Sequence, residues 1–350
     1  MVVSKLVGLF STDMGIDLGT ANSLVSVCGR GIVLSEPSVV AVKKGTNTVL
    51  LGGNAVGQAA KEMLGRTPAS IEAIRPLKAG VIADFDITEA MINYFIRKIH
   101  NRSRWFSPRV VFSIPSGITA VEKRAIYNSA ERAGAREVYL IEEPRAAGLG
   151  AGLPIHEPTG NMIVDVGAGT TEVAVLSLAD VVVCTNMRVA GDDMDLAICQ
   201  HMKKNYNILI GQNTAERIKI TVGSAIPLED EYTLEVNGRD AIAGLPRSVT
   251  VNSEEIREAL KEPVFQIIEG IRSTLEKTGP ELSADLVHRG ITLCGGGVLL
   301  RGFERLVREE TGLPVHFPDD PLKAVIHGLT IIIEHLDAFK DILESAEDDL

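Results

Sequence analysis

The 350-residue sequence has few cysteines, few aromatic residues and no long apolar run. Its four cysteines form no C-x-x-C pair, a usage typical of small hydrophobes in a reducing cytosol. No apolar run reaches the roughly 20 residues that span a bilayer, and the N-terminus lacks an apolar stretch followed by a small-residue cleavage site. We therefore expect a cytoplasmic protein that is neither secreted nor integral to the membrane.

Basic residues are also in the minority. The chain has 35 lysines and arginines against 46 acids, which gives a formal net charge of −11 at pH 7. An acidic surface disfavours broad contact with a nucleic-acid backbone. The same net negative charge opposes approach to an anionic membrane, so membrane binding requires a local segment that is suited to it.

Apolar, β-branched runs that end in small-residue turns alternate with stretches of helical periodicity. This alternation predicts an α/β protein with largely parallel sheets. The length exceeds one ordinary core of about 150 to 200 residues, so we expect two lobes. The lobes are related, because "IDLGT" at 16–20 is repeated as "VDVGAGT" at 164–170. A Pro- and Gly-rich segment at 151–160 marks the crossing between them.

One long helix is predicted over residues 253–276. Ser253 is its expected cap, acids follow in the first turn, and Pro263 predicts a break or kink.

The two repeated strand ends place a carboxylate before a turn of small residues. Asp17 precedes such a turn in the first lobe, and Asp165 does so in the second. Small residues let phosphate oxygens approach backbone amides, and Mg²⁺ favours a few carboxylates together with phosphates. Each turn alone is equally well a tight turn with a capping aspartate. The matched pair favours phosphate binding.

Two further motifs carry candidate chemistry. Residues 295–297 are three glycines after the strand "GITLC", which suits a turn against a flat adenine ring or a plain strand-to-helix turn. Glu143 precedes Pro144 at a predicted helix start, where a carboxylate is placed to orient an attacking water or simply to begin a helix.

These segments together resemble the superfamily of actin, heat-shock chaperones and sugar kinases, and more closely the MreB family of bacterial actins. The resemblance rests on "DLGTANSLV", "IRPLKAGVIADFD", "AGAREVYLIEEP", "NMIVDVGAGTTEVAVLSL", "TAERIK" and "CGGGVLLRG", among others. It covers nearly the whole chain and keeps the order of the motifs.

The resemblance implies an actin-like ATPase fold, with two related lobes of mixed sheets flanked by helices and a nucleotide cleft between them. Lobe I spans 1–154, with a small subdomain at about 35–72, and is completed by 320–350. Lobe II spans 155–319, with a small subdomain at about 191–252.

The resemblance also implies the roles of individual residues. Asp17 and Asp165 bind Mg²⁺ through water, and Glu143 positions the attacking water. The phosphate loops consist of Gly19, Thr20, Ala21 and Asn22 in the first lobe, and of Gly167, Ala168, Gly169 and Thr170 in the second. The nucleoside contacts are Glu216, Lys219, Gly295, Gly296 and Gly297, although Glu216 and Lys219 are equally well a solvated ion pair on one helix face.

Several positions depart from the family pattern, among them Gly148, the segment "KAVIHGLTIIIEHL" and the two positions described next. Ala168 stands where the family usually has glycine, and its methyl is expected to fit if φ is negative. Arg145 places a cation close to Glu143. Because of Ala168 and Arg145, the resemblance supports nucleotide binding more strongly than it supports a particular rate of hydrolysis.

The resemblance further implies head-to-tail filaments, paired and antiparallel, that associate with the inner face of the plasma membrane. Two segments suit membrane attachment. Val3, Leu6, Val7 and Phe10 form an apolar face on a short N-terminal helix, and Trp105 and Phe106 lie among Arg102, Arg104 and Arg109. Both patches suit packing onto the lobe as well.

We therefore expect a weak ATPase that polymerises with ATP and Mg²⁺ and organises the cell-wall elongation proteins that maintain cell shape. The alternatives are a polymerising nucleotide-binding protein with little or no turnover, a chaperone-type ATPase and a sugar kinase. The chain leaves no room for a peptide-binding domain, and it shows no further acid to activate a sugar hydroxyl.

Overall fold

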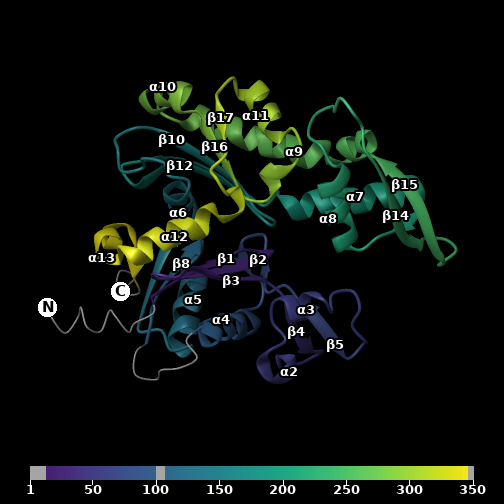
Figure 1. Ribbon diagram of the computed structural model, residues 1–350, viewed down its shortest axis with the longest axis horizontal. Coiled ribbons are helices and arrows are strands. Elements are labelled where there is room, and N and C mark those ends of the chain that lie inside the picture. Colours follow the sequence, from purple (N-terminus) through teal and green to yellow (C-terminus); the bar gives the residue numbers. More distant parts are fainter. Residues whose placement is uncertain (1–12, 100–106, 346–350) are drawn as a thin grey trace. The chain divides into compact units, whose positions relative to one another are not determined.

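The computed structural model describes residues 13–99 and 107–345. The chain divides into two compact units (Figure 1). The first consists of Met1–Pro158, Ser177–Val181 and Lys323–Leu350, and the second of Thr159–Leu176 and Val182–Leu322. The predicted membrane-contacting residues Val3, Leu6, Val7, Phe10, Trp105 and Phe106 lie outside the described residues.

The main sheet of the first unit has the strand order β18-β9-β8-β1-β2-β3. Its strands are β1 (Met14–Leu18), β2 (Asn22–Val27), β3 (Gly31–Pro37), β8 (Arg109–Ile114), β9 (Glu137–Glu142) and β18 (Glu344–Ser345). β1 is parallel to β8 and β8 to β9, whereas β1–β2, β2–β3 and β9–β18 are antiparallel. The expectation of largely parallel sheets is therefore wrong here, because short turns after β1 and β2 send the chain straight back.

The two faces of this sheet have different coverings. Met14 and Ile16 join the core formed with helices α4 (Phe85–Ile99) and α5 (Ala120–Arg132). Gly15 points the other way, and a Cβ there would lie 2.8 Å from Cβ of Leu329 in helix α12 (Ala324–Glu334). α12 also packs against α6 (Glu143–Gly150). Since side chains alternate along a strand, Asp17 shares the face that carries α12.

Short elements complete the first unit. They are β4 (Val40–Lys43), α2 (Leu50–Gly53), α3 (Gln58–Lys61), β5 (Ile71–Ile74), β6 (Leu77–Lys78), β7 (Val81–Ile82), α13 (Leu336–Phe339) and the 3₁₀ turn η3 (Lys340–Ile342). β4 pairs with β5, and β6 with β7.

The larger sheet of the second unit has the order β12-β11-β10-β16-β17. Its strands are β10 (Asn161–Val166), β11 (Thr171–Ser177), β12 (Asp180–Met187), β16 (Ile291–Cys294) and β17 (Val315–His316). Met162, Val164 and Val166 enter the core of this unit, so Asp165 lies on the opposite face of β10, as Asp17 does on β1.

A smaller sheet in the second unit contains β13 (Ile208–Leu209), β14 (Thr233–Asp240) and β15 (Pro246–Asn252). The helices of the unit are α7 (Gly191–Tyr206), α8 (Gln212–Val222), α9 (Ser253–Lys277), α10 (Pro280–Arg289) and α11 (Phe303–Thr311), with 3₁₀ turns η1 (Gly297–Leu299) and η2 (Pro321–Lys323), the latter reaching the boundary of the unit. Within residues 13–99 and 107–345, no helix has the length and apolar character of a membrane span.

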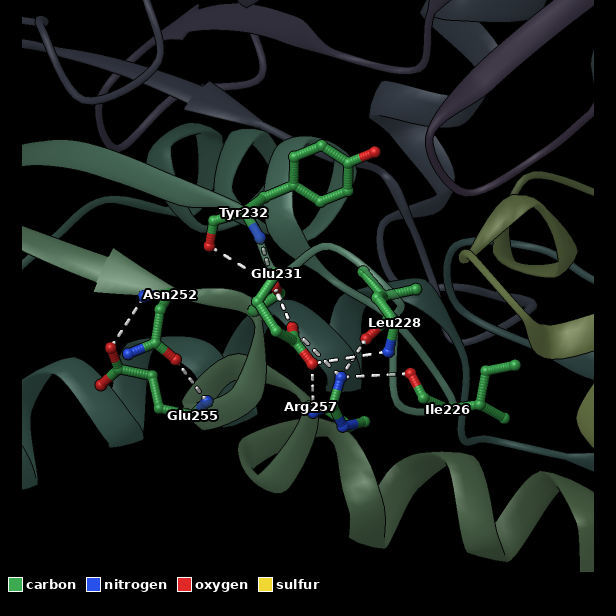
Figure 2. Close-up of polar contacts among 9 residues, drawn as sticks. Ile226, Leu228, Glu231, Tyr232, Asn252, Glu255 and Arg257 are labelled. Atoms are coloured by element: carbon green, nitrogen blue, oxygen red, sulfur yellow. Dashed lines mark hydrogen bonds and ion pairs between the residues drawn. The ribbon is translucent and has the colours of Figure 1, made fainter.

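Helix α9 begins with a reciprocal cap at Asn252 (Figure 2). The Asn252 side chain accepts a hydrogen bond from the Glu255 amide, and the Glu255 carboxylate accepts one from the Asn252 amide. The prediction of Ser253 as the cap is therefore wrong by one residue. The helix also continues through Pro263, so the predicted break does not occur.

An arginine at the start of α9 holds the segment that precedes β14. Arg257 donates to the carbonyl of Ile226 at 3.1 Å and pairs with Glu231 at 2.8 Å (Figure 2). Ser253 donates to Glu231 and accepts from the Tyr232 amide. This network fixes how the small sheet connects to α9.

Candidate nucleotide-binding loops

The first candidate loop follows Asp17 at the end of β1. Asp17 is registered with Leu24 on β2 and with Ser113 on β8. The Ser113 hydroxyl donates to Asp17 Oδ1 at 2.9 Å. Burial raises the pKa of Asp17 to about 6, and the Ser113 hydrogen bond opposes that rise. Burial thus disfavours the charged form of the Asp17 carboxylate more than the Ser113 hydrogen bond stabilises it, and a nearby cation stabilises that charged form.

Ser38, just after β3, holds the turn that follows Asp17. Its hydroxyl donates to the Gly19 carbonyl at 2.6 Å, and its amide donates to the Ala21 carbonyl at 2.9 Å. The hydroxyl also lies 2.9 Å from that of Ser23, and both side chains are fully buried. Two carbonyls of the turn are therefore fixed by one residue.

The second candidate loop follows Asp165 at the end of β10. Asp165 is registered with Glu172 on β11 and with Cys294 on β16. The Gly167 amide donates to the Thr170 carbonyl at 2.9 Å and closes the turn. The turn thus begins two residues after the carboxylate.

Ala168 fits this turn without backbone strain. It is not among the residues with positive φ, so the methyl occupies an ordinary conformation. The condition under which we expected alanine to be accepted is therefore met. The Ala168 carbonyl accepts a hydrogen bond from the Asp192 amide at 2.7 Å, and the Gly167 carbonyl accepts one from the Gly191 amide at 3.2 Å.

Lys219, a predicted nucleoside contact, binds Gly191 at the start of α7, and Gly191 in turn binds the second loop. Its ammonium, on α8, is 2.9 Å from Asp195 Oδ1 and donates to the Gly191 carbonyl at 2.8 Å. The ion pair of Lys219 is thus with α7, whereas the sequence suggested a partner at Glu216 on the same helix face. Glu216 is half-buried and close enough to influence the Asp195 carboxyl.

Asp195 is a buried acid that the sequence analysis did not single out. Only 4% of the Asp195 surface is exposed. Burial raises its pKa to about 6, with Glu216 and Asp192 adding to the rise and Lys219 opposing it. It sits within "AGDDMD", where three acids in four residues hide which one is buried.

The three glycines at 295–297 have different surroundings. Gly295 has φ +85°, and a Cβ there would lie 2.3 Å from Asp165 Oδ1. A Cβ at Gly297 would lie 2.3 Å from Val166 Cγ1. Gly296 is exposed, and a Cβ there would meet only Leu322 at 3.4 Å. Two of the glycines therefore permit close packing on β10, and Gly296 is the one with open space beside it.

Glu143 is the first residue of α6, and Pro144 follows at the helix start as expected. Arg145 is engaged elsewhere in the first unit. Its guanidinium lies 3.3 Å from Glu142, pairs with Asp180 and donates to the Ile342 carbonyl at 3.3 Å. The predicted cation near Glu143 is therefore bound to other partners.

The donor set suits Mg²⁺ held by few protein ligands. Within the part of the chain that the structure describes, no group of three or more His, Cys, Asp or Glu forms a cation site. Mg²⁺ commonly takes one or two carboxylates and completes its shell with water and phosphate oxygens. Asp17 and Asp165, each at a strand end before a small-residue turn, offer such carboxylates.

Comparisons with known proteins agree on one family. The model of the MreB/Mbl protein family matches residues 11–341. The chain is 52% identical over 337 residues to the cell shape-determining protein MreB of Escherichia coli (strain K12), covering 96% of this chain and 97% of that protein. It is 50% identical over 329 residues to the cell shape-determining protein Mbl of Bacillus cereus, covering 94% and 98%. Among solved structures, MreB5 of Spiroplasma citri bound to AMPPNP superimposes with a TM-score of 0.88 at 36% identity, covering 95% and 98%.

Proposed function

Because the chain belongs to the MreB/Mbl family and has its actin-like fold, we propose that it is an ATP-dependent filament protein that organises cell-wall synthesis and so maintains cell shape. One observation carries the proposal. Each unit contains a strand with an aspartate as its second-to-last residue, a turn of small residues and an antiparallel return strand. Two such loops in one chain suit binding of nucleotide phosphates and Mg²⁺.

The loops bind ATP or ADP through backbone amides, and Mg²⁺ supplies charge neutralisation at the phosphates when bound. The S. citri relative, solved with AMPPNP and with ADP, supports nucleotide binding. Glu143 orients the attacking water for a slow hydrolysis that promotes filament turnover. Its place at the start of α6 supports this role.

The chain assembles head to tail, in paired antiparallel filaments, on the inner face of the plasma membrane. A heterologous contact that does not close produces a fibre, and the filament multiplies weak membrane contacts by avidity. Wall-elongation proteins are the partners that the filament organises.

The described residues beside the two predicted membrane segments support a shared attachment point. Asp13 follows residues 1–12, and Arg109 follows the segment that contains Trp105 and Phe106. Arg109 donates to Asp13 Oδ2 at 2.6 Å through one guanidinium nitrogen and at 3.1 Å through Nε. Arg109, one of the three arginines of the predicted headgroup contact, also pairs with Asp337 at 3.7 Å. β1 and β8 are adjacent strands, so Asp13 and Arg109, which border the two segments, lie next to each other.

Sedimentation tests the assembly. The protein is pelleted with ATP, ADP or no nucleotide, each with Mg²⁺, with and without anionic liposomes. We expect ATP to give the largest pellet and liposomes to increase it. Protein that stays in the supernatant under every condition rules out the filament.

Phosphate release tests turnover. We expect Glu143→Ala to abolish release while ATP still binds, because the residue acts on water rather than on the nucleotide. Glu281→Ala is a matched control, since Glu281 is an exposed acid in the first turn of α10 beside a proline. Release that is equally low in the unsubstituted protein favours the alternative of a polymerising protein without turnover.

Liposome binding tests the membrane segments. Replacing Trp105 and Phe106 by alanine, and separately Leu6 and Phe10, is expected to reduce co-sedimentation with liposomes at unchanged filament formation. Undiminished binding in both variants rejects these segments as the attachment site.

A further inference from the structure

A chain of polar contacts connects a buried ion pair to the second candidate phosphate loop, residues 167–170. Lys219 binds Asp195 at 2.9 Å and the Gly191 carbonyl at 2.8 Å. Gly191 is the first residue of α7, and its amide donates to the Gly167 carbonyl at 3.2 Å. The ion pair is thus one residue removed from the loop.

The packing at this junction is close. A Cβ at Gly191 would lie 3.2 Å from the Gly167 carbonyl oxygen, 3.3 Å from Lys219 Nζ and 3.5 Å from Ala168 Cα. The loop and the lysine therefore both contact the start of α7 at Gly191. A displacement of the α7 start moves the carbonyls of the loop, and with them the orientation of its amides.

Lys219 contacts both the buried acid and the start of α7. Its ammonium donates a hydrogen bond to the Gly191 carbonyl at 2.8 Å and lies at ion-pair distance, 2.9 Å, from Asp195 Oδ1, a buried oxygen with no hydrogen-bond partner among the described residues. Asp195 is 4% exposed, so its charge has to be balanced from within the unit. Glu216 and Asp192 face the same carboxyl with like charge, which leaves Lys219 as the cation that holds it.

We infer that Asp195 and Lys219 are a positioning pair, which holds the start of α7 against the second loop and so keeps that loop in its phosphate-binding conformation. This inference rests on the proposed binding of ATP. It differs from the role implied by the family resemblance, in which Lys219 contacts the nucleoside. A nucleoside contact affects ATP and adenosine alike, whereas a positioning pair affects only ligands with phosphates.

The test compares the affinities of ATP and adenosine, each measured by competition against a fluorescent ADP analogue in the presence of Mg²⁺. Lys219→Met and Asp195→Asn are expected to weaken ATP by about tenfold, as for the loss of one oriented charged interaction, and adenosine by less than about twofold. Lys203→Met and Asp230→Asn are matched controls at exposed positions of the same unit, and we expect both to bind ATP normally.

The double variant, Asp195→Asn with Lys219→Met, is expected to lose no more ATP affinity than Lys219→Met alone, because the two residues act as one unit. It also guards against misfolding. Lys219→Met alone leaves a buried carboxylate unpaired, whereas the double variant buries no charge.

Gly191→Ala disturbs the junction without changing any charge. Since the added methyl presses on a backbone carbonyl, we expect the same selective loss of ATP affinity.

Equal weakening of ATP and adenosine in Lys219→Met overturns the inference in favour of a direct nucleoside contact. Unchanged ATP affinity in both single variants overturns it as well. If the unsubstituted protein binds adenosine and ATP equally, or neither, the proposed function fails and the inference with it. Selective weakening in the variants supports both.

Discussion

The two candidate phosphate loops share a sequence pattern and a strand register, yet they are supported in different ways. The first is held by the side chain and amide of Ser38, which bind the carbonyls of Gly19 and Ala21. The second is held by the backbone amides of Gly191 and Asp192, at the start of α7. A neutral side chain supports one loop, and a helix end with an ion pair behind it supports the other.

This difference bears on how each loop responds to change. Ser38, which supports the first loop, directly follows β3 in the same sheet as β1 and has no titratable side chain. The support of the second loop depends on α7 and on Lys219 of α8, which pack with the small sheet of that unit. We therefore expect the support of the second loop to be sensitive to charge and pH, and the support of the first to depend mainly on the Ser38 hydroxyl.

The largest expected effect comes from Gly295→Ala. The new Cβ would lie 2.3 Å from Asp165 Oδ1 and 2.4 Å from the Val166 carbonyl, at a residue with φ +85°. We expect a loss of roughly 3 to 5 kcal/mol in the free energy of unfolding, from overpacking and backbone strain together. Urea denaturation measures it. Gly296→Ala is the control, and an equal loss there contradicts the account.

Asp195 is expected to make stability fall as pH rises. Its pKa is about 6 in the folded protein against 3.8 for the ordinary group, so the folded state binds the proton more tightly. The group therefore lowers stability progressively between about pH 4 and pH 6, by about 3 kcal/mol in total, and the cost is constant above that range. Groups facing it are Lys219, Glu216 and Asp192.

Unfolding by urea at several pH values tests this prediction. Relative to Asp195→Asn, the unsubstituted protein should lose stability across that window. A stability difference between the two proteins that does not change with pH shows that Asp195 titrates normally.

Ser38→Ala tests the first loop in the same way. It removes the hydroxyl bound to the Gly19 carbonyl and leaves the buried Ser23 hydroxyl without that partner. We expect a loss of about 1 to 3 kcal/mol in the free energy of unfolding, with little pH dependence. Ser35→Ala, at an exposed position of β3, should be neutral. A strong pH dependence of the Ser38→Ala effect removes the contrast between the loops.

The smallest effect is expected for Ala168→Gly. Because Ala168 has an ordinary φ, glycine there gains no strain relief and adds freedom to the unfolded chain. We expect a loss of about 0.4 to 1 kcal/mol in the free energy of unfolding, with unchanged ATP affinity. A stabilised variant, or one with tighter ATP binding, indicates that the methyl does disturb the loop.

The sequence predicted those features of the loops that depend on neighbours along the chain. Asp17 and Asp165 do lie at strand ends, each as the second-to-last residue, and the turn of small residues does follow each strand. It missed Ser38 and Ser113, which lie 19 and 96 residues from the groups they bind, because only the fold brings them close. The residue pattern alone led to the wrong expectation of largely parallel sheets, since apolar alternation does not reveal the direction of pairing, whereas the mixed sheets implied by the family resemblance are confirmed.

The roles of charged residues were the least predictable. From the sequence, Lys219 was equally well one half of a surface ion pair with Glu216 on α8, whereas in the structure it pairs with Asp195 on α7. Arg145 and Arg109 read as cations near functional segments, and each is bound to acids of its own unit. A long side chain reaches several partners, and burial of one acid selects among them.

The most direct test of the central claim is hydrogen exchange of the backbone amides in both loops, residues 18–23 and 167–171, with and without ATP and Mg²⁺. If both loops bind phosphate, exchange slows in both segments when ATP is added, and adenosine does not reproduce the effect. Exchange that ATP leaves unchanged in either segment contradicts the claim that the two loops together bind the nucleotide.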